Sequence, residues 1–209
     1  MTKLRLPALL LWLLSFSVLA TIYLAWLIYP LEISWLGLEK VVYLSSKTIS
    51  YNFNQLMQFL TIPWVSELKM ADFPTSDSGL GHFVDVKHLF VFCQLVFLVL
   101  LYPSLVCLRQ LFQKKGLWLH QKAFLLAAVL PLVIAVMAAL IGFDAFFTLF
   151  HQVLFPGNSS WLFNPYTDPV IYILPEDYFL HCFLIFFVIY ELLFFGLYGL
   201  GKWQWRKRQ

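Results

Sequence analysis

Four long apolar segments constrain the fold of this chain more than any other feature. They cover residues 9–29, 88–108, 123–141 and 179–201. Each is close to the about 20 residues that a helix needs to cross about 30 Å of hydrocarbon. Only 12% of the residues are charged, against roughly 25% in soluble domains. The sequence therefore predicts an all-α membrane protein with four transmembrane helices, forming a single integral membrane domain over residues 1–209.

The first apolar segment follows Lys3 and Arg5, as the hydrophobic region of a signal peptide would. Its apolar run of about 23 residues is longer than the 7–15 residues of such a region. No small-residue cleavage site is apparent after it. We therefore expect an uncleaved first transmembrane helix.

The basic residues predict the orientation. Ten of the 14 Lys and Arg residues precede the first segment, surround the connection between the second and third, or follow the fourth. The positive-inside rule places these ends in the cytoplasm, so both termini are predicted to be cytoplasmic. The two long loops, residues 30–87 and 142–178, then face outward and hold ten of the 11 acids. Topology alone explains the basic ends, so no nucleic-acid partner is expected.

Both outer loops contain segments with helical periodicity. Phe53, Leu56, Met57 and Leu60 recur on one helix face, and Ile33–Leu44 has a weaker pattern of the same kind. We expect short helices lying on the outer interface, with apolar faces toward lipid or the helix bundle. In the second loop, the segment GFDAFFTLFHQVLF carries its polar residues on one stripe. They are Asp144, Thr148, His151 and Gln152.

The stretch GHFVDVKHLF, at the entrance of the second apolar segment, places titratable groups at the outer membrane surface. On a helix, Asp85 lies three residues from both His82 and His88, so its carboxylate can reach either imidazole. A carboxylate on one ring nitrogen fixes the tautomer and leaves the other nitrogen free as a base. His151 shares its polar stripe with Asp144, which is too far along the helix for a direct bond. Two histidines from separate loops suggest acid–base chemistry at the outer leaflet.

Other classes of function remain open at this point. Outer histidines can bind haem or a metal in a non-enzymatic membrane protein. The polar stripe could instead pack on a partner in an assembly subunit. No zinc-site spacing is present, so we predict no metal site, and no cofactor is expected. The three cysteines, Cys93, Cys107 and Cys182, all lie within or beside apolar segments, which argues against a thiol oxidoreductase.

The motifs HFVDVK at 82–87, FHQVLFPGNSSWLF at 150–163 and NPYTDPVIYILPEDYF at 164–179 resemble the bacterial lipoprotein intramolecular transacylase family. The resemblance covers the whole layout of spans and outer motifs. It implies an acyltransferase of the bacterial cell membrane whose active site is extracytoplasmic. Its substrate would be a diacylated lipoprotein in the outer leaflet, among membrane lipid, with no obligate protein partner. The family's two essential histidines correspond by motif to His82 and His151.

The implied reaction moves an acyl chain from the sn-2 ester of the lipoprotein's diacylglyceryl group to the α-amino group of its N-terminal cysteine. The product is the N-acyl lyso-form lipoprotein. We expect His82 to be the base, because Asp85 can orient it, and the second histidine to stabilise the oxyanion and protonate the leaving alkoxide. An acyl-histidine intermediate remains an alternative. Candidate supporting groups are Asn158 and Trp161 for an oxyanion hole, and Asp144 and Asp168 as further carboxylates.

Overall fold

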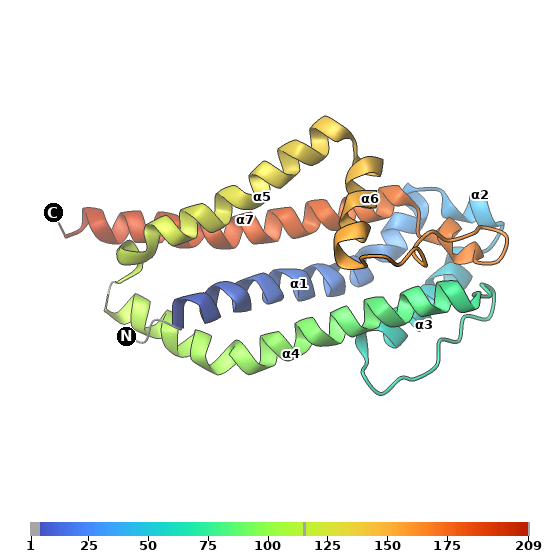
Figure 1. The fold of residues 1–209 in the computed structure, drawn as a ribbon, viewed down its shortest axis with the longest axis horizontal. Helices are drawn as coiled ribbons and strands as arrows, with labels where there is room; N and C mark the ends of the chain where they lie inside the picture. Colours follow the sequence, from blue (N-terminus) through green and yellow to red (C-terminus); the bar gives the residue numbers. More distant parts are fainter. Residues whose placement is uncertain (1–4, 115, 209) are drawn as a thin grey trace. The chain divides into compact units, whose positions relative to one another are not determined.

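Four long helices dominate the chain, as Figure 1 shows. The structure, a computed structural model, describes residues 5–114 and 116–208. The long helices are α1 (Arg5–Trp35), α4 (Asp77–Gln113), α5 (Gln121–Ile141) and α7 (Glu176–Arg206). Together with the turn before α5, these are the helices that are long and apolar enough to cross a membrane. The predicted all-helical membrane fold is confirmed at this level.

Short elements fill the segments between the long helices. They are α2 (Leu38–Val42), α3 (Ser46–Thr61), α6 (Phe143–Leu154) and two 3₁₀ turns, η1 (Leu117–His120) and η2 (Pro169–Ile173). The periodic segments around residues 53–60 and 143–154 are helical, as their apolar faces predicted. The weaker Ile33–Leu44 pattern is divided between α1 and α2, because Gly37 adopts a left-handed conformation with φ 64°.

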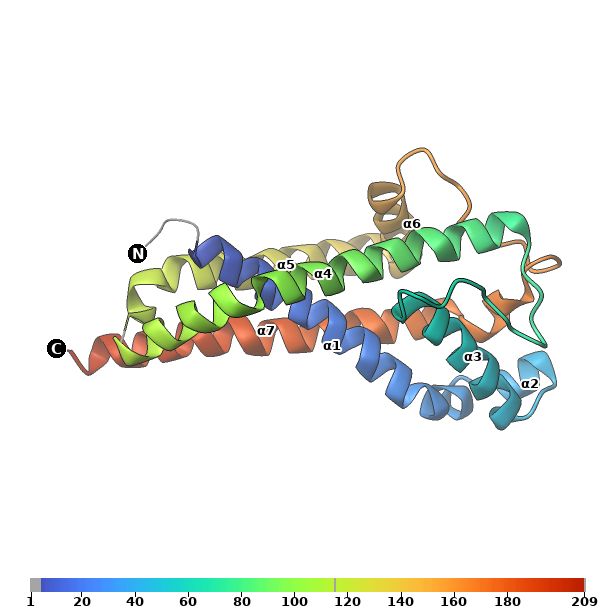
Figure 2. The same cartoon turned by 90° about the horizontal axis from the view of Figure 1, so that it is seen from below.

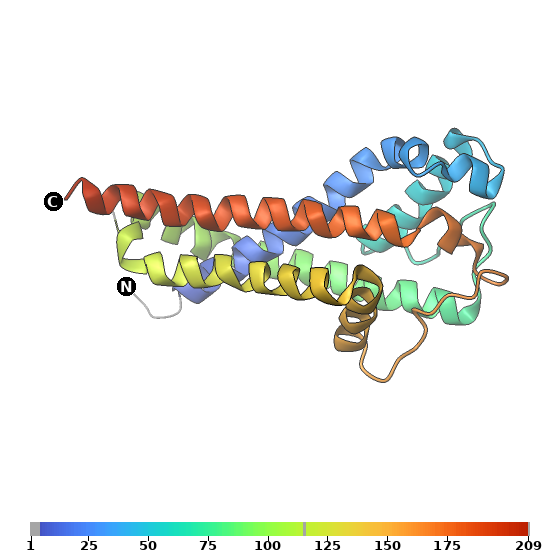
Figure 3. The ribbon, with the colours of Figure 1, turned by 90° about the horizontal axis from the view of Figure 1, so that it is seen from above.

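The described chain divides into two compact units. Unit 1 comprises Met1–Thr21, Cys93–Ile141 and Leu184–Gln209, and unit 2 comprises Ile22–Phe92 and Gly142–Phe183. In unit 1, the first part of α1 lies beside the last part of α4, where Ser104 Oγ donates to the Ala8 carbonyl at 3.3 Å. In the same unit, α5 runs alongside α7 (Figure 3). Tyr190 links these two helices by donating to the Ala127 carbonyl at 3.2 Å.

Unit 1 is held together by a cluster of buried apolar side chains from all four long helices. Close packing of side chains, rather than apolar burial from water, holds helices together in lipid. The cluster contains Leu9, Trp12, Leu13, Cys107, Leu111, Leu117, Phe124, Ala128, Tyr190, Phe194 and Leu197.

Unit 2 has an aromatic core where the end of α1 lies beside α3 (Figure 2). The Tyr29 and Phe53 rings stack with centroids 3.5 Å apart, and Tyr178 packs edge-on against both. The buried Tyr29 hydroxyl donates to the Ile173 carbonyl at 2.6 Å, so its polar group is satisfied. This core joins α1, α3, η2 and the start of α7.

A buried carboxylate fixes the start of α4. Asp168 is 3% exposed and accepts hydrogen bonds from Ser76 N at 2.7 Å and Ser76 Oγ at 2.8 Å. Gly79 lies so close that a Cβ there would be 2.3 Å from Asp168 Oδ1. Only glycine fits this close to the carboxylate. The position of Asp168, directly before η2, therefore determines where α4 begins.

Replacing Gly79 with alanine should therefore destabilise unit 2. The added methyl group would displace the Asp168 carboxylate from Ser76, at a cost on the order of 1–3 kcal/mol. Thermal unfolding of the purified protein in detergent measures the effect as a lower midpoint. Gly81→Ala, on the same helix, is the matched control because its Cβ would meet no heavy atom within 4 Å. Equal midpoints for the two variants would contradict the close approach.

Candidate active site

Two buried imidazoles from different helices meet in unit 2. His82 lies in the second turn of α4 and is 6% exposed, and His151 lies near the end of α6 and is 8% exposed. Their ring centroids are 5.7 Å apart, with an interplanar angle of 42°. The two histidines singled out in the sequence are thus close neighbours within one site.

The tautomer of His151 follows from a hydrogen bond within its own helix. Its Nδ1 lies 2.8 Å from the backbone carbonyl oxygen of Phe147. A carbonyl oxygen can only accept, so Nδ1 carries the proton and donates it. In the neutral ring, Nε2 then holds a free lone pair. Nε2 is therefore the ring nitrogen of His151 that is free to accept a proton.

Aromatic rings cover the histidine pair. Trp161 stacks on the His151 imidazole with centroids 4.8 Å apart. Phe155 and Phe163 meet the His82 imidazole edge-on, at 5.0 and 5.6 Å. Burial among these groups lowers the pKa of His151 below its ordinary value, although the hydrogen bond to Phe147 acts in the opposite direction. A neutral His151 is thereby favoured near neutral pH.

The surroundings of His82 differ from those expected from its spacing to Asp85. His82 Nδ1 is buried and has no hydrogen-bond partner among the residues that the structure describes. Asp85 instead accepts a hydrogen bond from Asn158 Nδ2 at 2.9 Å. The carboxylate thus engages the loop after α6 rather than an imidazole. Helical spacing left Asp85 within reach of either imidazole and did not indicate Asn158 as its hydrogen-bond partner.

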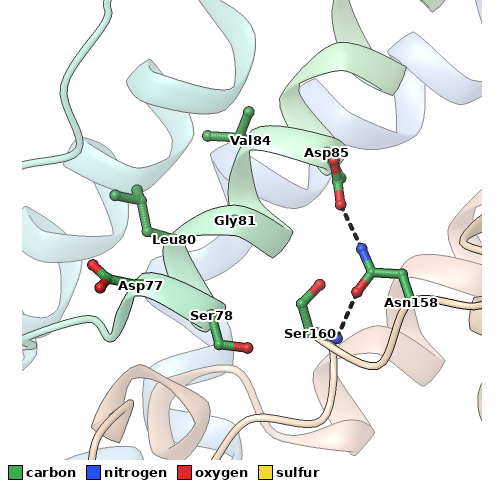
Figure 4. Close-up of a pocket in the computed structure, with 8 residues that line it drawn as sticks. All are labelled: Asp77, Ser78, Leu80, Gly81, Val84, Asp85, Asn158 and Ser160. Carbon is green, nitrogen blue, oxygen red and sulfur yellow. Dashed lines mark hydrogen bonds between the residues drawn. The ribbon is translucent and has the colours of Figure 1, made fainter.

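Asn158 organises the loop after α6 and ties it to α4. Besides its bond to Asp85, its Oδ1 accepts from Ser160 N at 2.8 Å (Figure 4). Its backbone carbonyl accepts from Trp161 Nε1 at 3.1 Å. The single indole N–H of Trp161 is therefore already donated. This geometry gives Trp161 a packing contact with His151, while Asn158 retains a second amide N–H.

The other two carboxylates singled out in the sequence make their hydrogen bonds to groups other than the imidazoles. Asp144 shares a side-chain hydrogen bond with Glu176, at the start of α7. Asp168 holds Ser76, as described above. Burial raises the pKa of Asp168, but hydrogen bonds from Thr167 and Ser76 outweigh this effect and leave the pKa lowered. Asp168 is thus an ionised structural group rather than a partner of either histidine.

Three further titratable side chains are also not part of the pair. His88 is exposed. His181 Nδ1 lies 2.8 Å from Glu32 Oε2, linking α7 to α1 within unit 2. Glu191 belongs to unit 1, where neither carboxylate oxygen has a hydrogen-bond partner among the described residues.

The described residues contain no group of three or more His, Cys, Asp or Glu side chains that could hold a metal ion.

Phe147, Phe155 and Phe163 also contribute to the site, although no sequence motif singled them out. The Phe147 contact was in principle detectable, because it lies four residues before His151 on the same helix. Phe163 comes from irregular structure, for which periodicity gives no signal.

The contact between Trp161 and His151 leads to a testable prediction about the pKa of the His151 imidazole. We expect NMR titration of labelled imidazoles to give a His151 pKa below the ordinary value of about 6.5. Trp161→Ala should move that pKa back toward 6.5, because the ring becomes better solvated. Trp64→Ala, which removes a tryptophan that is 83% exposed, serves as the control and should leave the value unchanged. An unchanged pKa in Trp161→Ala would show that another group sets the protonation state.

Comparisons with known proteins show which family this chain resembles. The model of the family described as lipoprotein intramolecular transacylase Lit matches residues 4–179. A solved structure of the membrane-integral lipoprotein intramolecular transacylase Lit from Bacillus cereus is similar, with a TM-score of 0.84 and 26% sequence identity. The similarity covers 96% of this chain and 92% of that one.

Two further structures of the Bacillus cereus protein carry a single histidine mutation, to arginine in one and to alanine in the other. Both match with a TM-score of 0.76 and 26% identity over 96% of this chain, and over 88% and 90% of theirs. The comparison with curated proteins found no match. The family match covers most of the chain and agrees with the motifs around both histidines, so the chain belongs to the lipoprotein intramolecular transacylase (Lit) family of multi-pass membrane acyltransferases.

Proposed function

We propose that the protein transfers an acyl chain from the sn-2 ester of a lipoprotein's diacylglyceryl group to the α-amino group of the same N-terminal cysteine. The observation that carries this proposal is the buried His82–His151 pair, with the His151 tautomer fixed by Phe147. The substrate brings both the nucleophile and the acyl group. The site therefore has to supply only proton transfer and stabilisation of charge.

In the proposed reaction, the amine nitrogen attacks the sn-2 carbonyl carbon while Nε2 of His151 takes a proton from that nitrogen. An N-terminal amine has a pKa of about 7.7–8, so a neutral imidazole is a base of suitable strength. The bond between the carbonyl carbon and the sn-2 oxygen then breaks. The proton passes through His82 to the departing oxygen, so the products are an amide and a free hydroxyl group, and both rings end neutral.

This assignment of roles differs from the one expected from the sequence. The base role falls to His151 because its Nδ1–H is held by the Phe147 carbonyl, which directs the lone pair of Nε2 away from its own helix. His82 has no carboxylate bonded to its ring. Its unpaired Nδ1 leaves it free to relay a proton and to donate to the developing oxyanion. Asn158, with one unused amide N–H, is a second candidate donor.

The proposed setting is the outer leaflet of a bacterial cell membrane. Residues 1–209 would form one membrane domain with both termini in the cytoplasm, and the segments that carry the histidines would face outward. The concentration of basic residues at the predicted cytoplasmic ends supports this orientation. A lipoprotein's ester linkages would then lie at the depth of His82 and His151.

The activity is tested by expressing His82→Ala and His151→Ala in a bacterial host that makes diacylated lipoproteins. Removing a general acid or base typically reduces the rate by about 10²–10⁴-fold. Mass spectrometry of the N-terminal lipopeptides should then show little N-acylated lyso-form. His88→Ala, on the same helix as His82 but exposed, should retain wild-type conversion. Wild-type conversion by either of the first two variants would remove that histidine from the mechanism.

The two roles can be separated with a substrate whose sn-2 ester oxygen is replaced by sulfur. A thiol has a pKa of about 8.5, so a thiolate can leave without receiving a proton. We expect the thioester to restore turnover of His82→Ala at least about tenfold, and to restore His151→Ala much less, since the amine must still lose its proton. Preferential rescue of His151→Ala would reverse the assignment.

A further inference from the structure

A pocket lined by two carboxylates and by apolar side chains is formed by residues next in sequence to the site, and it has no role in the proposed proton transfers. Its volume is about 460 Å³, and it opens between the first turns of α4 and the loop after α6 (Figure 4). We call it the α4 pocket. Its lining residues are Asp77, Ser78, Leu80, Gly81, Val84, Asp85, Asn158 and Ser160.

Two residues that line this pocket are next in sequence to residues of the histidine site. Gly81 lines the pocket and is followed by His82, and Ser160 lines it and is followed by Trp161. Trp161 in turn stacks on His151. A molecule bound in the α4 pocket would therefore contact residues adjacent to each half of the catalytic pair.

The charge of the α4 pocket favours cations over anions. The start of a helix usually attracts anions through its free amides. Here Ser76 already accepts from two of them, Gly79 N at 3.1 Å and Leu80 N at 2.8 Å. The lining adds two carboxylates, Asp77 and Asp85, and contains no basic side chain. A lipid phosphate group is thus a poor occupant.

The pocket also offers hydrogen-bond acceptors that are not in use. Ser160 Oγ is buried and has no hydrogen-bond partner among the described residues, and Figure 4 shows it between Asn158 and α4. The Asp85 carboxylate accepts one bond from Asn158 through Oδ2 and has capacity for others. Acceptors of this kind suit the N–H groups of a peptide main chain.

We propose that the α4 pocket binds the peptide segment that follows the lipidated cysteine of the substrate, and that it favours a basic over an acidic residue directly after that cysteine. This inference rests on the proposed function, which supplies a substrate with two apolar chains and one peptide. Leu80 and Val84 give the pocket apolar surface, but burying the carboxylates Asp77 and Asp85 under a fully apolar acyl chain would leave them without polar partners, which is costly. The peptide is the remaining part of the substrate, and it begins at the reacting amine.

The test uses the purified full-length protein in detergent with synthetic diacylated lipopeptides that carry Lys, Ser or Glu after the cysteine. We expect kcat/KM to be highest for Lys and lowest for Glu. Asp77→Asn should reduce the Lys-to-Glu ratio by about fourfold, the effect of one solvent-accessible charge. Since each peptide is compared with itself across variants, intrinsic differences in amine reactivity cancel.

Glu67→Gln is the matched control, because Glu67 is a 69% exposed carboxylate of unit 2 that does not line the pocket. Its Lys-to-Glu ratio should equal that of the wild type. High salt should also reduce the wild-type ratio, since accessible charges are screened. Equal ratios in wild type and Asp77→Asn would overturn the inference while leaving the transacylase activity standing. Failure of the wild type to convert any of the lipopeptides would instead overturn the proposed function and this inference with it.

Discussion

The Asp168 carboxylate is the interaction on which the rest of the site depends. It is buried, and it accepts hydrogen bonds from the backbone and hydroxyl of Ser76 and from the hydroxyl of Thr167. An ionised carboxylate inside a protein is stable only when such bonds replace its hydration. Because these bonds fix the first turn of α4, they also fix the rotational position of His82 and Asp85 on that helix. The same residue anchors the segment that follows Phe163, so one carboxylate aligns both sides of the site.

The two histidines differ in their surroundings, and this difference fits the separate roles that they have in the proposed proton transfer. His151 is held by a carbonyl of its own helix and covered by Trp161, which together favour one neutral tautomer. His82 is packed between phenylalanine rings, with a ring nitrogen left unpaired. Environments that distinguish paired titratable groups are the usual basis for separate acid and base roles. Here the distinction comes from the backbone and aromatic packing rather than from a carboxylate.

The sequence predicted the helices well, because their signals are long or strongly periodic. The apolar runs indicated α1, α4, α5 and α7, and the face formed by Phe53, Leu56 and Met57 indicated α3. It also singled out His82 and His151, through motifs that resemble a known family, and the structure brings their rings together. It did not predict that Asp85 would bond to Asn158, because helical spacing pointed to the two histidines and says nothing of a loop far along the chain. Side-chain partners in irregular segments depend on how the loop packs, and residue spacing carries no information about that.

The aromatic rings around the histidine pair also bear on a competing reaction, which is hydrolysis of the ester by water. Water can also attack the ester, and hydrolysis would release a free fatty acid and leave the lipoprotein with one chain fewer. Trp161, Phe155 and Phe163 pack against the imidazoles and replace part of the water that would otherwise surround them. Under the proposed mechanism, these aromatic rings favour transfer of the acyl chain to the amine over its release by hydrolysis. The fidelity of the reaction would then depend on residues that take no part in moving protons.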